Sequence, residues 1–150
     1  MSGIDIKSAA FSDHAPIPSR YTKDGDDVSP PLVWSGIPEE AKELVLLCED
    51  RDAPAGTFTH WLVTGIDPRS SGVDTGQLPP GGEPRPNGFG DPGWGGPRPP
   101  AGDPAHRYFF RLYAVSEPLP LPEQPSAKDV HDAMAGRQQA SGTLVGVYQR

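Results

Sequence analysis

The sequence EDRDAPAGTFTHW at residues 49–61 separates two apolar runs, LVLLC at 44–48 and LVTGI at 62–66. Both runs have the length of strands, are rich in leucine and β-branched residues, and are bounded by Asp, Pro and Gly. They therefore predict two neighbouring strands joined by a polar connection. Two acids and a histidine come at the strand ends, where side chains can form the wall of a pocket.

Asp50 is the first candidate for that wall. Because side chains alternate along a strand, Asp50 continues the face of Leu46 and Cys48, and its carboxylate emerges beside the core with Asp52 just beyond it. The alternative is local turn chemistry, in which Asp accepts neighbouring backbone N–H groups and Pro54 restricts φ. This stretch taken alone favours the turn.

A second stretch, GGPRPPAGDPAHRYFFRLYAV at residues 95–115, changes that balance. Its first half is a Gly/Pro loop and its second half, 106–115, has the pattern of a strand. Residues His106, Tyr108, Phe110 and Leu112 share one face of that strand. The imidazole and the phenol are therefore expected to point in the same direction.

Together the two stretches resemble the two signature regions of the phosphatidylethanolamine-binding protein family, specifically its bacterial Raf-kinase-inhibitor-like branch. The resemblance covers nearly the whole chain. It is carried by DRDAP at 50–54 with HW at 60–61, GPRPPAG at 96–102 with HRY at 106–108, SPPLVW at 29–34, NGFG at 87–90, GWGGP at 93–97 and LVGVY at 144–148.

The chain departs from the family pattern at two positions. Arg51 stands where many members have Pro, which loosens the turn. Arg98 stands in the Pro-rich loop where many bacterial members have Cys, which brings a cation near the mouth of the pocket.

Five residues match the family's ligand pocket: Asp50, His60, Pro100, His106 and Tyr108. Imidazole and phenol donors can hold a phosphate or carboxylate oxygen. The Asp50 carboxylate would repel an anion unless it orients an imidazole or pairs with a ligand ammonium. We therefore expect a small anionic or zwitterionic ligand, such as phosphate or a phosphoethanolamine-like headgroup.

The resemblance also implies a non-enzymatic protein without catalytic residues, cofactor or metal. In some members it implies inhibition of a kinase or a protease, so a protein partner of that kind is expected. A homodimer follows only by analogy with bacterial relatives, since no residue here argues for one.

Four other interpretations remain at this stage. Two histidines and one carboxylate can form an iron site, so a metal-dependent enzyme is the alternative function. A scaffold or inhibitor that acts through its surface is another. Each candidate also has a structural interpretation: His60 as a satisfied core residue, Tyr108 as a packing aromatic and Pro100 as a stiffener of its loop. A serine hydrolase is weaker, because no serine lies in a nucleophile-elbow context.

Composition limits the classes further. A chain of 150 residues is long enough for one domain, here 1–150, although 18 Gly, 20 Pro and only 35% hydrophobic residues are also typical of disordered chains. The patterned apolar runs argue for a fold. A net charge of −7 excludes a basic nucleic-acid footprint and disfavours adsorption to anionic membranes.

Residues 79–104 contain nine Pro and eight Gly, which is typical of a linker. Phe89 and Trp94 indicate instead an ordered loop, because large rings in a flexible linker would be exposed without gain. The resemblance implies that this long loop folds over the pocket.

We expect a cytoplasmic protein without stable membrane insertion. Cys48 is the single cysteine, so no disulfide can form within the chain. The N-terminus does not resemble a signal peptide, and no apolar run approaches the roughly 20 residues of a membrane span.

The predicted fold is mostly β, with a central antiparallel sheet, a smaller second sheet and one short peripheral helix. The central strands are expected at 44–48, 62–66, 106–115 and 143–148, and weaker strands near 4–6 and 29–34. The helix is expected near 127–138, with Ser126 as its N-cap and Asp129 in its first turn. Whether a cis peptide bond precedes Pro31 is left open.

Overall fold

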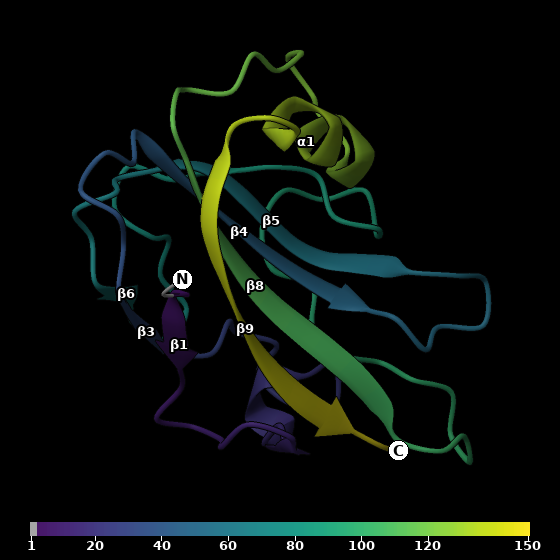
Figure 1. The fold of residues 1–150 in the computed structure, drawn as a ribbon. Coiled ribbons are helices and arrows are strands. Elements are labelled where there is room, and N and C mark those ends of the chain that lie inside the picture. The colour runs from purple at the N-terminus through teal and green to yellow at the C-terminus, as the bar shows by residue number, and fades with distance from the viewer. Residues whose placement is uncertain (1–2) are drawn as a thin grey trace.

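The computed structural model describes residues 3–150, which form two sheets and one α-helix (Figure 1). The larger sheet has six strands in the order β2-β9-β8-β4-β5-β7. Its neighbours are antiparallel, except that β2 runs parallel to β9. The strands are β2 (Ala15–Pro16), β4 (Glu43–Asp50), β5 (Phe58–Ile66), β7 (Glu83–Pro84), β8 (His106–Val115) and β9 (Gln138–Tyr148). The predicted fold class is confirmed.

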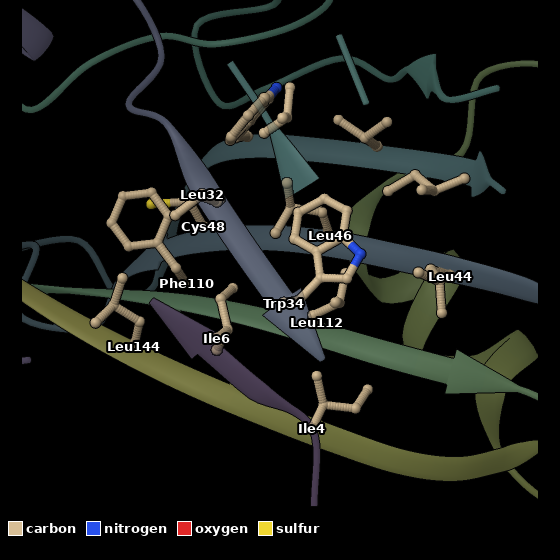
Figure 2. Close-up of a cluster of buried hydrophobic side chains, with 14 of the residues drawn as sticks. Ile4, Ile6, Leu32, Trp34, Leu44, Leu46, Cys48, Phe110, Leu112 and Leu144 are labelled. Carbon is tan, nitrogen blue, oxygen red and sulfur yellow. The ribbon is translucent and has the colours of Figure 1, made fainter. Parts of the chain in front are cut away.

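The smaller sheet packs on one face of the larger one. Its strands are β1 (Asp5–Lys7), β3 (Leu32–Ser35) and β6 (Gly72–Val73), and a 3-10 turn, η1 (Ser19–Tyr21), precedes β3. Figure 2 shows Ile6 and Trp34 of the smaller sheet among Leu46, Phe110 and Leu112 of the larger one. Fully burying an aliphatic side chain contributes about 1.5–3 kcal/mol, so this layer is a main source of stability.

The helix α1 (Ala127–Met134) covers part of the opposite face. Val130 and Met134 are buried there against the strand residues Val45, Leu47 and Leu62. The helix begins as predicted: the Ser126 hydroxyl accepts from the Asp129 amide at 3.1 Å, and the Asp129 carboxylate accepts from the Ser126 amide at 3.0 Å. These two bonds satisfy amides that the first helical turn leaves unpaired.

The helix and several strands differ in their bounds from the prediction. Strand β3 is Leu32–Ser35 rather than 29–34, and β4 is Glu43–Asp50 rather than 44–48. The helix ends at Met134 rather than 138, because Gly136 has a φ of 78° and Gln138 already pairs with Val115 in the sheet. Strand β9 accordingly begins at Gln138 rather than Thr143. Strand β5 begins at Phe58 rather than Leu62, because its ladder with β4 continues to the pair Asp50–Phe58. Strands β5 and β9 are longer than their apolar runs because backbone pairing with the neighbouring strands continues past those runs.

The described residues answer the open question about Pro31. No peptide bond among residues 3–150 is cis, so the bond before Pro31 is trans. Within the same range, no helix combines the length and the apolar character needed to cross a membrane.

Candidate functional site

A cavity of about 250 Å³ lies at the end of the larger sheet where β4 ends and β8 begins. All five residues predicted from the sequence line it. The full lining is Asp50, Ala53, Pro54, Phe58, His60, Phe89, Arg98, Pro99, Pro100, His106 and Tyr108. A larger hollow of about 620 Å³ lies beside β3 and β6, but its lining contains no histidine and only one acid, Asp74. The smaller cavity therefore has the titratable side chains expected of a binding site, and it is the candidate site.

Strand register brings Asp50, Tyr108 and His106 together. Asp50 pairs directly with Tyr108 across β4 and β8, and Cys48 pairs with Phe110 in the core beside them. His106 lies two residues from Tyr108 and so shares its face. The sequence argument for these residues was correct, because it used only the alternation of side chains along each strand.

His60 reaches the cavity through a β-bulge. Trp61 pairs with Cys48 and Thr59 pairs with Glu49, so β5 has one extra residue, His60, at this point. The extra residue interrupts the alternation, and both His60 and Trp61 face the side of the sheet that carries the core and the cavity. Regular alternation from Trp61 would have turned His60 toward the helix side.

Asp50 and His106 form a buried pair. His106 Nδ1 donates to Asp50 Oδ2 at 2.6 Å, and the two residues are 5% and 3% exposed. Burial alone would lower the pKa of His106, but the hydrogen bond and charge of Asp50, helped by Asp103, raise it above the usual histidine value. Asp50 therefore favours the protonated form of His106. The turn interpretation also holds, since Asp50 Oδ1 accepts from the Asp52 amide at 2.8 Å.

Asp103 is a functional candidate that the sequence analysis missed. Its Oδ2 lies 3.4 Å from His106 Nε2, so both ring nitrogens of His106 face a carboxylate oxygen. The sequence did contain a signal that could have predicted this contact: Asp103 lies in a turn three residues before His106, the first residue of a strand. The loop is held in place by the C-terminus, where Gln149 Nε2 donates to the Asp103 carbonyl at 3.0 Å.

Asp52 turns away from the cavity. Its two carboxylate oxygens accept from Arg107 Nε at 3.0 Å and from Arg107 Nη2 at 2.9 Å, and one of them also accepts the Arg107 amide at 2.9 Å. The side-chain hydrogen bond from Arg107 lowers the pKa of Asp52. Of the two acids in DRDAP, only Asp50 lines the cavity.

His60 is held by the long Gly/Pro loop. Its Nδ1 donates to the Gly95 carbonyl at 2.6 Å, and its ring lies among those of Phe58, Tyr108 and Phe89, with centroid distances of 4.9, 5.2 and 5.8 Å. Burial lowers the pKa of His60, although the Gly95 hydrogen bond and the Asp50 charge act in the opposite direction. The imidazole is therefore neutral at pH 7.

Tyr108 has a polar atom without a well-formed hydrogen bond. The residue is fully buried, and its hydroxyl makes no well-formed hydrogen bond within residues 3–150, although it lies close enough to Asp50 for a weaker interaction that raises its pKa. Burial raises the pKa of this phenol, and the nearby Asp50 charge raises it further, so the hydroxyl keeps its proton. Tyr108 lines the cavity, and its hydroxyl is a protonated donor without a well-formed hydrogen bond within residues 3–150.

The loop at 79–104 is ordered by contacts with distant segments. Trp94 stacks on Phe110 at 5.9 Å, and its Nε1 donates to the Tyr21 carbonyl at 3.1 Å. The Gly96 amide donates to Asp27 Oδ1 at 2.7 Å. Phe89, Arg98, Pro99 and Pro100 of this loop line the cavity. The loop folds over the pocket as the resemblance implied.

The two-histidine, one-carboxylate metal site has little geometric support. His106 Nδ1 and Asp50 Oδ2 bond to each other rather than converge on a common point, and His60 Nδ1 is bonded to Gly95. In the part of the chain that the structure describes, no group of three or more His, Cys, Asp or Glu side chains is arranged to hold a metal ion.

Comparison with known proteins gives a consistent family assignment. A family model described as phosphatidylethanolamine-binding protein matches residues 7–149. A UPF0098 protein of Methanothermobacter thermautotrophicus is 46% identical over 152 residues, covering 98% of this chain and 99% of the relative. LppC of Mycobacterium tuberculosis, named as a candidate lipoprotein, is 45% identical over 148 residues, covering 97% of this chain and 72% of its own. Because one relative is named as a lipoprotein, the cytoplasmic location stays a prediction.

Solved structures agree in fold. CT736 of Chlamydia trachomatis, described as a candidate phosphatidylethanolamine-binding protein homologue, has a TM-score of 0.92 at 35% identity, covering 100% of this chain and 99% of its own. YbcL of Escherichia coli, described as a member of the mammalian family of these proteins, has a TM-score of 0.91 at 26% identity, covering 99% of each chain.

Proposed function

Because the chain belongs to the phosphatidylethanolamine-binding protein family, we propose that it is a non-enzymatic binding protein whose pocket takes a small ligand with a phosphate-type headgroup. The observation that carries this proposal is the Tyr108 hydroxyl, which is buried in the cavity lining and makes no well-formed hydrogen bond with any of the described residues. A buried donor left unsatisfied costs about 1–3 kcal/mol. A ligand oxygen at this position removes that cost.

Size and charge support the same ligand class. A cavity of about 250 Å³ is below the roughly 300–1,000 Å³ of sites for drug-sized ligands, so it suits a headgroup rather than an acyl chain. Arg98 contributes an exposed cation to the lining, and Asp50 contributes a carboxylate. This pair of charges suits a zwitterion such as phosphoethanolamine, whose phosphate and ammonium need opposite partners.

The chemistry of the lining supports binding rather than catalysis. His106 and Asp50 resemble the base and orienting acid of a catalytic triad, but His106 Nε2 faces Asp103 instead of a nucleophile. The raised pKa of Tyr108 keeps its phenol protonated, which makes it a poor nucleophile.

Calorimetric titration of Tyr108→Phe with inorganic phosphate and phosphoethanolamine tests the proposal. Removing the hydroxyl should weaken binding by about 1.5–3 kcal/mol, the range for hydrogen bonds to charged groups. The folded state should be as stable as before or more so, because the lost group makes no well-formed hydrogen bond. Tyr113→Phe is the matched control, since it makes the same change on the same strand but on the face covered by α1. Wild-type protein that binds neither ligand, or Tyr108→Phe that binds both normally, would disprove the pocket's role.

The remaining predictions have separate tests. Stoichiometric iron or zinc in protein purified without a tag would favour the metal-dependent enzyme instead. A kinase or protease partner, expected from the family resemblance alone, is sought by pull-down from lysate. The homodimer is tested by sedimentation.

A further inference from the structure

The partner of His60 determines which of its ring nitrogens carries the proton. A backbone carbonyl can only accept a hydrogen bond, so His60 Nδ1, at 2.6 Å from the Gly95 carbonyl, must be the protonated nitrogen. In the neutral imidazole, Nε2 then holds a lone pair. This nitrogen has no hydrogen-bond partner among residues 3–150, and the ring that carries it lines the cavity. His60 thus offers the cavity an acceptor.

The remaining polar groups give the cavity both donors and acceptors. Tyr108 offers a hydroxyl donor, and His106 Nε2 offers a second one that it shares with Asp103 at a long 3.4 Å. Asp50 adds a carboxylate, whose oxygens already accept from His106 and from the Asp52 amide but keep further lone pairs. A ligand that only accepts hydrogen bonds would leave His60 Nε2 unsatisfied and would lie against the Asp50 charge.

We propose, resting on the function proposed above, that the pocket selects a phosphate that carries a P–OH group, and that His60 is the residue that sets this specificity. The P–OH donates to His60 Nε2 while the phosphate oxygens accept from Tyr108 and from His106. Inorganic hydrogenphosphate and singly protonated phosphomonoesters have this chemistry. Sulfate and phosphodiesters do not, because all their unesterified oxygens are acceptors near neutral pH.

The charged groups around His60 are compatible with its role as an acceptor. Asp50 faces it from β4, and its charge favours the imidazolium. Lys23 opposes this, and its Nζ is paired with Asp27 Oδ2 at 2.6 Å. Burial outweighs these charges and lowers the pKa of His60, so above about pH 6.5 the proton has to come from the ligand.

Hydrogenphosphate and sulfate are the sharpest pair of probes, because they are tetrahedral dianions that differ by one proton. At pH 7.5 the wild-type protein should bind phosphate at least tenfold more tightly than sulfate in calorimetric titrations. Lowering the pH toward 5.5 should strengthen sulfate binding, because a protonated His60 can donate to it, and the difference should shrink. Phosphoethanolamine should weaken above about pH 6, where a phosphomonoester loses its last proton.

A diester that keeps the ammonium separates a free phosphate from a lipid headgroup. Glycerophosphoethanolamine has the ammonium of phosphoethanolamine but no P–OH, and it should bind at least tenfold more weakly than phosphoethanolamine at pH 6. If it binds as tightly, the ammonium rather than the P–OH is the donor, and the proposal is wrong.

His60→Gln assigns the specificity to this residue. A glutamine amide can present either its donor or its acceptor, so the variant should bind phosphate and sulfate within about threefold of each other. Nitrogen-15 NMR of wild-type imidazoles is the second measurement: the neutral form protonated at Nδ1 should persist with phosphate, whereas sulfate should produce imidazolium.

The outcomes distinguish the two proposals. Equal affinity of the wild-type protein for phosphate and sulfate at pH 7.5 overturns the selectivity and leaves the phosphate pocket intact. A preference for phosphate that persists in His60→Gln overturns the role of His60. Failure to bind any of the four probes overturns both the selectivity and the function proposed above.

Discussion

His60 and Gly95 are joined by two hydrogen bonds that run in opposite directions. The Gly95 amide donates to the His60 carbonyl at 2.9 Å, and His60 Nδ1 donates to the Gly95 carbonyl at 2.6 Å. The first bond holds the long Gly/Pro loop to β5, and the second decides which nitrogen of the imidazole faces the cavity. The backbone carbonyl of Gly95 thus fixes the tautomer of His60.

Adding a methyl group to Gly95 should disturb the pocket more than the fold. A Cβ there would lie 2.5 Å from Phe89 Cδ2, and Phe89 is 43% exposed, so its ring can move outward. We expect Gly95→Ala to lower the free energy of unfolding by only about 1 kcal/mol, at the low end for overpacking, and to weaken phosphate binding. Urea unfolding and calorimetry measure the two effects.

Gly96→Ala is the matched comparison. Its Cβ would lie 2.6 Å from the Tyr21 carbonyl oxygen and 2.5 Å from Asp27 Oδ1, and backbone cannot move aside as a partly exposed ring can. The free energy of unfolding of Gly96→Ala should fall by about 1–3 kcal/mol or more. If Gly95→Ala proves the less stable of the two, Phe89 is not free to move.

The two pocket histidines should titrate on opposite sides of the usual value of about 6.5. His106 has a raised pKa and His60 a lowered one. In Asp50→Asn the burial of His106 remains and only Asp103 still raises its pKa, so the pKa of His106 should fall and that of His60 should fall further. Proton NMR of the imidazole signals measures both, and a His106 pKa that is unchanged in the variant would contradict the assignment.

The same shifts predict how stability depends on pH. His106 binds its proton more tightly in the folded state, so its contribution is complete below about 6.5 and is lost as the pH rises through its raised pKa. His60 acts in reverse: its contribution is complete above about 6.5 and is lost as the pH falls through its lowered pKa. Asp50→Asn should reduce the loss on the alkaline side, because only Asp103 then holds the proton of His106, and urea unfolding between pH 5 and 8.5 would detect the change.

Substitutions of the two acids in DRDAP, Asp50 and Asp52, should have different effects on ligand affinity. Asp52 is bonded to Arg107 outside the cavity, so Asp52→Asn should leave the affinity for phosphoethanolamine within about twofold of wild type. Asp50→Asn removes the partner of the ligand ammonium and also lowers the pKa of the donor His106, so it should weaken phosphoethanolamine tenfold or more and inorganic phosphate less. Equal losses in the two variants would mean that the acids act through the shape of the turn.

Stability of the helix should be independent of ligand binding. Ser126→Ala removes the acceptor of the Asp129 amide and should cost about 1 kcal/mol. Because α1 lies on the face of the sheet away from the cavity, phosphate affinity should not change. Lys128→Ala, which breaks only an exposed pair on the same helix, is the control and should leave the urea midpoint unchanged. A loss of affinity in Ser126→Ala would show that the two faces are coupled.

The sequence by itself determined the parts of this protein that depend on local geometry. The strand β8 was predicted with both of its ends, and Asp50 was correctly placed on the face of Leu46 and Cys48. His106 and Tyr108 were correctly placed on one side of their strand, and the helix was correctly begun at its Ser126 cap. Alternation with period two and capping involve only residues close in the chain, so a pattern can reveal them.

Three features of the site were decided only by the tertiary structure. His60 faces the cavity, Asp52 lies outside it, and Asp103 contacts His106. The bulge at His60 exists because the ladder between β4 and β5 pairs Trp61 with Cys48 and Thr59 with Glu49. The protonation of His60 depends on a carbonyl thirty-five residues away, and the ionisation of His106 depends on a carboxylate fifty-six residues away. Register and loop closure bring such partners together, and no local pattern encodes the distance between them.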